Sequence, residues 1–260
     1  MPALLTVISA ADQSKQIIEL SYRLGRLLNY EPIITTCNDR ELCLKKQLES
    51  ENYEVSGSEK DFFQTISAWL EKPSLDISLI TVPQKVVNIN KTYKATRFFS
   101  GCRMLKIPYL ILPEKVNVSW HPKHIFFPVC TRDGEKEASA WAGSWTKANN
   151  SEITILHPEF RSKENQGRLW RLLAFIQRLF DNSNVPYKTI KAGAGKKETN
   201  NKALEEAEKT PDSLLIVPAT RLNSPEYIFI GPPGIRLLKK RVNTPILFVN
   251  PRHDMYVPCS

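Results

Sequence analysis

The chain has 260 residues, of which 42% are hydrophobic and 24% charged, and its net charge is +9. That composition is typical of a globular protein with room for two domains, and no apolar run approaches the roughly 20 residues needed to cross a bilayer. Five scattered cysteines without a C-x-x-C pair, and an N-terminus without the basic flank of a secretory signal, predict a soluble cytoplasmic protein. Acidic residues interspersed among the basic ones disfavour nucleic-acid binding.

The first half alternates short apolar strands with amphipathic helices. Ile17, Leu20 and Leu24 have the spacing of a buried helical stripe, in a helix that follows a polar cap at Asp12. The run "ISLITV" has no polar alternation, which is typical of a parallel strand covered on both faces. Strands are expected at 4–9, 31–37, 53–56, 77–82 and 108–112, and later helices at about 40–48, 59–70 and 94–105.

The second half repeats this alternation after a linker at 113–123. Its first helix carries Ala138, Trp141, Ala142 and Trp145 on one face, and these side chains are expected to pack on a sheet. Strands are expected at 124–129, 152–157, 187–190, 214–217 and 245–249, and later helices at 163–181, 200–209 and 235–242. Repeated strand–helix alternation predicts mostly parallel sheets with helices on both faces.

The two halves share landmarks at a nearly constant separation. Each half has a Tyr that opens its third strand, a Pro that ends its fourth and a Pro that opens its fifth. The pairs are Tyr53 and Tyr187 (134 apart), Pro83 and Pro218 (135 apart), and Pro108 and Pro245 (137 apart). This order predicts two copies of one module, at residues 1–115 and 121–260.

The segments "FFPVCTRDGEKEASAWAGSWTKANNSEITILH" and "DSLLIVPATRLNSPEYIFIGPPG", with the final strand "NTPILFVN", resemble the universal stress protein family. Nearly the whole chain is similar to a tandem member of that family. The resemblance implies an α/β fold of two tandem doubly wound domains, each with a five-stranded, mostly parallel sheet in the order 3-2-1-4-5. It also implies that the domains pair through strands 108–112 and 245–249, and it leaves a further homodimer or a protein partner open.

The loop after the fourth strand keeps the spacing of the family's ATP-binding branch but not its residues. Where that branch has Gly, Gly, Gly and Ser or Thr, this chain has Pro218, Arg221, Gly231 and Pro232. Glycine lets backbone N–H groups approach phosphate, whereas proline has no N–H. Arg221 adds a cation that could compensate. The corresponding first-half loop, at 83–97, contains no glycine.

The position that reads adenine in the family's ATP binders, an aspartate ending strand one, is Cys130 in the second half and Ser9 or Ala10 in the first. We therefore expect a non-enzymatic regulatory or stress-response protein without a cofactor, which does not bind ATP in the usual way. The alternative is an ATP-binding switch that uses the loop at 218–234. Ligands of open α/β sheets bind at the carboxyl ends of the strands, so the candidate pocket residues are Cys130, Pro218, Ala219, Arg221, Gly231 and Gly234.

Other motifs favour structural interpretations. The "KAGAGKK" stretch at 191–197 lacks Walker A spacing and indicates a turn. His121 and His124 have no partners at metal-ligand spacing, so no metal site is expected. Asp133 and Glu135 indicate a helix N-cap and a first-turn acid. Cys130 itself is either a thiol activated by a helix N-terminus or a small buried residue, and we favour burial. No catalytic set is apparent.

Overall fold

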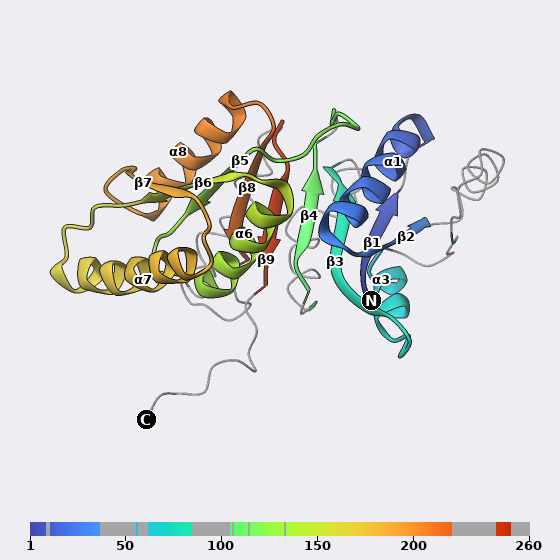
Figure 1. The fold of residues 1–260 in the computed structure, drawn as a ribbon, viewed down its shortest axis with the longest axis horizontal. Helices are drawn as coiled ribbons and strands as arrows, with labels where there is room; N and C mark the ends of the chain where they lie inside the picture. The colour runs from blue at the N-terminus through green and yellow to red at the C-terminus, as the bar shows by residue number, and fades with distance from the viewer. Residues whose placement is uncertain are drawn as a thin grey trace. The chain divides into compact units, whose positions relative to one another are not determined.

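The computed structural model describes residues 1–8, 11–36, 56, 62–84, 105, 107–113, 115–132, 134–219 and 243–250. The chain divides into two compact units (Figure 1). Unit 1 consists of Met1–Cys102 and Ile107–Trp120, and unit 2 of Arg103–Lys106 and His121–Ser260. The division after Trp120 falls within the linker at 113–123.

Unit 1 contains a parallel sheet in the strand order β2-β1-β3-β4. Its described elements are β1 (Pro2–Ile8), α1 (Ala11–Leu28), β2 (Glu31–Thr36), α3 (Phe62–Leu70), β3 (Asp76–Pro83) and β4 (Tyr109–Leu112). Beyond β2, Ser56 forms a single parallel bridge with Thr35. The rest of the strand expected at 53–56 and the helix expected at 40–48 lie outside the described residues. So does the helix expected at 94–105, except for Leu105, which is not helical.

Helix α1 covers the sheet of unit 1 with the stripe that its sequence predicts. Ile17, Leu20 and Leu24 are almost completely buried. The helix ends at Leu28 in a Schellman motif, in which Asn29 has φ 57° and the Tyr30 N–H donates to the Gly25 carbonyl over 2.7 Å. At the other end, α1 already includes Asp12, so the expectation that Asp12 precedes the helix as its cap is wrong.

Unit 2 contains a parallel sheet in the order β9-β8-β5-β6-β7. Its described elements are β5 (His124–Pro128), α6 (Glu135–Asn149), β6 (Glu152–His157), α7 (Lys163–Asn182), β7 (Tyr187–Lys191), α8 (Lys196–Lys209), β8 (Ser213–Pro218) and β9 (Ile246–Val249). Counted along the chain from β5, the strands stand in the order 3-2-1-4-5 from the β7 edge. The helix expected at 235–242 lies outside the described residues.

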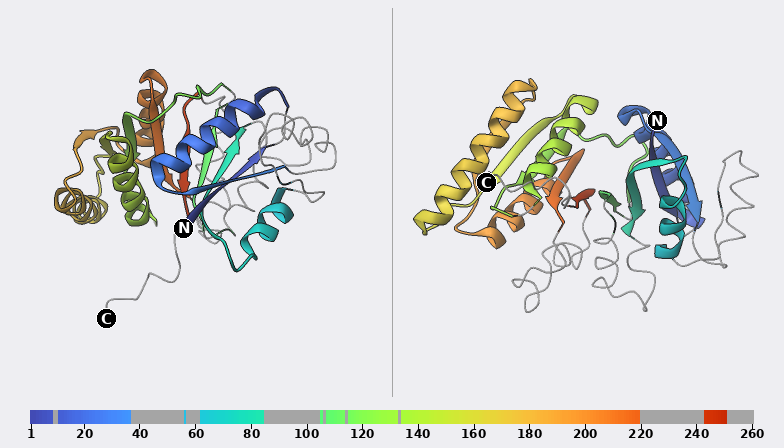
Figure 2. Two further views of the ribbon diagram at one scale, coloured as in Figure 1. Left: turned by 45° about the vertical axis from the view of Figure 1, so that its right-hand side comes forward. Right: turned by 90° about the horizontal axis from the view of Figure 1, so that it is seen from below.

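The helices of unit 2 lie on both faces of its sheet. The chain runs outward from β5 to β7 and then returns to β8, so right-handed crossovers place α6 and α7 on one face and α8 on the other (Figure 2). On α6, Ala138, Ala142 and Trp145 are fully buried. At the edge, β7 is mostly exposed and pairs with β6.

Unit 2 also holds Leu105, which precedes β4 in the chain. The Asn250 side chain, directly after β9, donates from Nδ2 to the Leu105 carbonyl over 2.6 Å.

None of the helices in the described ranges is long and apolar enough to span a membrane. An α/β class with parallel strands flanked by helices is therefore confirmed, whereas a chain of two tandem five-stranded domains stays a prediction.

Candidate functional site

The predicted pocket lies where β5 and β8 leave the sheet of unit 2. These strands are neighbours, with His124 opposite Ser213 and Phe126 opposite Leu215, so the segments that follow them emerge at the same edge. Within one unit this is the point where crossovers to the two faces separate, the usual ligand position in open α/β sheets. Cys130, Pro218 and Ala219 lie here and are buried. Arg221, Gly231 and Gly234 lie outside the described residues.

Backbone donors at this edge already have acceptors within the protein. The Ala219 N–H donates to the Val249 carbonyl over 2.8 Å, and the Val129 N–H donates to the Leu156 carbonyl over 2.8 Å. The Cys130 N–H donates to the Glu135 carboxylate, with 2.6 Å between N and Oε1. Pro218 has no N–H. A phosphate at the ends of β5 and β8 would therefore find no free donor among these four backbone positions.

Glu135 is a buried carboxylate at this edge. Left-handed conformations at Thr131 (φ 59°) and Gly134 (φ 84°) turn the chain back after β5, and this turn places Glu135, the first residue of α6, against Cys130. Its side chain is only 1% exposed, and its Oε1 accepts the hydrogen bond from the Cys130 N–H. Burial raises the pKa of Glu135 to about 7, against the opposing effects of the Cys130 hydrogen bond and the nearby charges of Arg132 and Lys196.

This geometry refines the sequence interpretation of 133–135. Glu135 does lie in the first turn of α6, as predicted, but the expectation that Asp133 is the N-cap is wrong, because the N-cap is Gly134, which offers no side-chain hydrogen bond. A first-turn acid normally faces solvent and interacts with the helix dipole. Here the carboxylate is instead buried and accepts a hydrogen bond from the Cys130 N–H, just after β5. Asp133 lies outside the described residues.

The Cys130 thiol is 1% exposed. Burial and the neighbouring Glu135 raise its pKa to about 12, although Arg132, Lys196 and the Thr199 hydroxyl act in the opposite direction. A thiol with such a pKa is protonated at neutral pH and is a poor nucleophile. Of the two interpretations of Cys130 from the sequence, the structure therefore favours the buried residue over the activated thiol.

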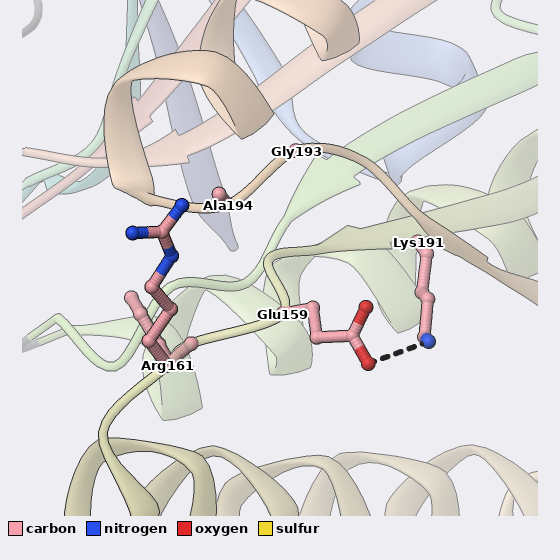
Figure 3. Close-up of a pocket in the computed structure, with 6 residues that line it drawn as sticks. Glu159, Arg161, Lys191, Gly193 and Ala194 are labelled. Carbon is pink, nitrogen blue, oxygen red and sulfur yellow. Dashed lines mark hydrogen bonds and ion pairs between the residues drawn. The ribbon is translucent and has the colours of Figure 1, made fainter.

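A separate cleft of about 440 Å³ opens at the carboxyl ends of β6 and β7 (Figure 3). It lies between the loop after β6 and the loop after β7. The side chains of Glu159 and Lys191 form an ion pair of 2.7 Å there. The lining residues are Glu159, Phe160, Arg161, Lys191, Gly193 and Ala194.

The sequence predicts the turn at 191–197, which forms one wall of this cleft, but it does not predict that the turn lines a cleft. The other wall is not predicted at all. Gly193 does turn the chain, with φ 96°, and the Ala194 N–H donates to Glu198 Oε2 over 2.7 Å. The opposite wall comes from Glu159–Arg161, and the available signal was a polar segment directly after an apolar strand. Elsewhere, no cluster of three or more metal-ligating side chains occurs among the residues that the structure describes.

Comparison with known proteins identifies the fold. No protein-family model matches the chain, and no curated protein matches it. Among solved structures it is similar to a universal stress protein from Archaeoglobus fulgidus, with a TM-score of 0.63, 11% identity, and coverage of 96% of this chain and 97% of that chain. A functionally unknown protein from Pseudomonas aeruginosa gives a TM-score of 0.62, 13% identity, and coverage of 96% and 93%. At these identities the likeness shows a universal stress protein-like fold and nothing further.

Proposed function

We propose that this protein is a cytoplasmic, non-enzymatic regulator of the universal stress type, built from two tandem modules, and that it does not bind ATP in the family's usual way. The fold that it shares with the Archaeoglobus fulgidus universal stress protein supports the class. The repeated landmarks of the sequence support the tandem arrangement, as does the occurrence of parallel strands flanked by helices in both units.

The observation that carries the proposal on ATP is the hydrogen bond from the Ala219 N–H to the Val249 carbonyl, 2.8 Å long. The loop that would hold the phosphates begins at Pro218 and Ala219. Proline has no N–H to donate, and the next amide is already part of the bonding between β8 and β9. Phosphate loops work by directing several such amides at the ligand.

The end of β5 supports the same conclusion. An aspartate would read adenine there in the ATP binders, and this chain has a thiol. The adjacent carboxylate of Glu135, whose pKa is about 7, is partly ionised at neutral pH. A buried carboxylate that carries negative charge at this edge of the sheet disfavours binding of a polyanion such as ATP, because like charges repel strongly where water is excluded.

Pairing of the two modules through strands 108–112 and 245–249 is part of the proposal. In the order of each unit taken alone, β4 and β9 are the last strands. One chain would then resemble a dimer of single modules. Sedimentation velocity of the purified chain tests whether two copies associate further.

The experiment that tests the absence of ATP uses the purified full-length chain. Ligands released by denaturation are identified by mass spectrometry, and binding of added Mg–ATP is measured by equilibrium dialysis. We expect no adenine nucleotide at stoichiometric level and no saturable binding. Arg221→Ala is the informative variant, and Arg178→Ala, which removes an exposed arginine of α7, is its matched control. Stoichiometric ATP in the parent and in Arg178→Ala, but not in Arg221→Ala, would establish the nucleotide switch instead.

A further inference from the structure

We infer that the cleft between the β6–α7 loop and the β7–α8 loop binds a small organic oxyanion, a phosphate ester or a carboxylate, through the guanidinium of Arg161. The cleft volume of about 440 Å³ lies in the range of small-molecule sites, which is roughly 300–1,000 Å³. It is formed by β6 and β7, one strand away from the predicted pocket at β5 and β8. The inference therefore does not depend on whether ATP binds there.

Arg161 is the anchor because its charge is not used within the described part of the protein. It forms neither an ion pair nor a hydrogen bond there, and it is exposed on the cleft wall. Figure 3 shows its guanidinium beside Ala194 and apart from the ion pair between Glu159 and Lys191. A guanidinium presents two parallel N–H groups that match the two oxygens of a carboxylate or phosphate.

The opposite wall can supply a second cation. Lys191 Nζ lies 2.7 Å from Glu159 Oε1, and both side chains are more than half exposed, at 60% and 63%. Exposed ion pairs contribute little to stability, so Lys191 can turn from Glu159 to a ligand oxygen at small cost. With two cations and one carboxylate, the charged lining carries an excess of one positive charge.

The amino end of α8 is not the anchor. The Ala194 N–H, just before α8, donates to Glu198 Oε2 over 2.7 Å, so this donor is occupied by a side chain of α8. The geometry assigns recognition to the two cationic side chains. Backbone atoms of Gly193 and Ala194 then report on binding because they line the space that the ligand fills.

The test follows the amide signals of Gly193 and Ala194 by heteronuclear NMR in the full-length protein. Inorganic phosphate and succinate are added separately, with sodium chloride at equal ionic strength as the reference. We expect a saturable shift of both signals with at least one of the two anions. Arg161→Gln should weaken that binding at least tenfold, which corresponds to about 1.4 kcal/mol, and Lys191→Gln should weaken it less.

Arg178→Gln removes an exposed arginine of the same unit outside the cleft and should bind as the parent does. Arg161→Lys keeps the charge without the planar fork and should fall between the parent and Arg161→Gln. Saturation by phosphate alone identifies a phosphate ester, and saturation by succinate alone identifies a carboxylate. The inference is overturned if neither anion shifts these signals beyond chloride, or if Arg161→Gln binds as tightly as the parent. ATP binding that is abolished by Arg221→Ala would refute the proposed function and leave this cleft unaffected.

Discussion

The backbone N–H of Cys130 and the carboxylate of Glu135 are joined by a hydrogen bond of 2.6 Å, although both residues are only 1% exposed. This bond ties the segment that leaves β5 to the first residue of α6. It satisfies a buried amide, which would be costly to leave without a partner. The same contact keeps the titratable Glu135 carboxyl out of water, and the free-energy cost of burying that group depends on pH.

Stability of the folded chain should fall as pH rises because of Glu135. Its pKa is raised from 4.5 to about 7, so between these values the folded state holds a proton that the unfolded state has lost. The contribution of this proton to the free energy of unfolding is complete below about pH 4.5, declines as pH rises, and is lost above about pH 7. The change amounts to about 3 kcal/mol. Glu135→Gln keeps an oxygen for the Cys130 N–H and cannot ionise. Urea unfolding should show the variant about as stable as the parent at pH 4.5 and more stable at pH 8.

Glu164→Gln is the control for this experiment. Glu164 lies in the first turn of α7, and its side chain is 72% exposed, so its replacement should leave the pH dependence almost unchanged. A Glu135→Gln protein that is less stable than the parent at pH 8 would show that the ionised carboxylate is the form that supports the fold.

The Cys130 thiol should be protected from alkylation. With its pKa at about 12, the thiolate is scarce at pH 8, and the side chain is also shielded from reagent. We expect iodoacetamide to modify Cys130 more than a hundredfold more slowly in buffer than in urea, as measured by mass spectrometry of its tryptic peptide. Equal rates in the two solutions would mean that the thiol is open and activated.

Gly193→Ala should destabilise unit 2. At φ 96° a side chain is strained, and an added Cβ would lie 2.5 Å from Glu198 Cβ and 2.8 Å from Glu198 Oε2. We expect a loss of about 2 kcal/mol in the free energy of unfolding, measured by urea titration. Gly195→Ser is the matched control. No atom lies within 4 Å of its new Cβ, and serine is a good N-cap for α8, so this change should be neutral or stabilising.

In unit 1, Ser21→Ala should leave a buried hydroxyl without its acceptor. Thr6 Oγ1 donates to Ser21 Oγ over 2.8 Å, and Ser21 Oγ donates to the Ile17 carbonyl over 2.7 Å. The single change should cost about 1–3 kcal/mol. Thr6→Val combined with Ser21→Ala removes both hydroxyls and should be less damaging than Ser21→Ala alone. Urea titration of the four proteins gives the coupling energy, and simple additivity would contradict this interpretation.

The strands of unit 2 could be located closely from the sequence, whereas the start of α8 could not. β6 occupies 152–157 as predicted, because its apolar run is bounded by Ser151 and Pro158. Helix α8 begins at Lys196 rather than at residue 200. Its first turn is polar and its N-cap, Gly195, makes no side-chain hydrogen bond, so the usual start signals are missing.

Helix stripes were predicted with an error of about one residue. On α7, the sequence spacing predicts a stripe of Leu169, Leu172, Leu173, Ile176 and Leu179. Leu169, Leu173 and Ile176 are buried, whereas Leu172 is only partly buried and Phe180 replaces Leu179 as the last buried position. Spacing alone does not decide between neighbouring apolar residues at a helix end. The larger aromatic ring reaches Tyr187, with 5.7 Å between ring centroids, and that contact is formed only in the folded unit.

The site was predictable only in part. Cys130 could be placed at the end of β5, because the apolar strand stops there. Burial of Glu135 could not be foreseen, since it depends on left-handed turns at Thr131 and Gly134. The cleft brings together Arg161 and Gly193, which lie on different loops, and no local pattern encodes that proximity.

The hydrogen bond between Asn250 and Leu105 bears on how the protein could be dissected. Leu105 belongs to unit 2 but lies upstream of β4, so the polypeptide passes between the units three times. A recombinant fragment starting at His121 would lack that carbonyl and leave the Asn250 amide without its 2.6 Å acceptor. A fragment intended to contain all of unit 2 should therefore also include residues 103–106, joined to it by a new connection, because a single cut in the chain cannot supply them.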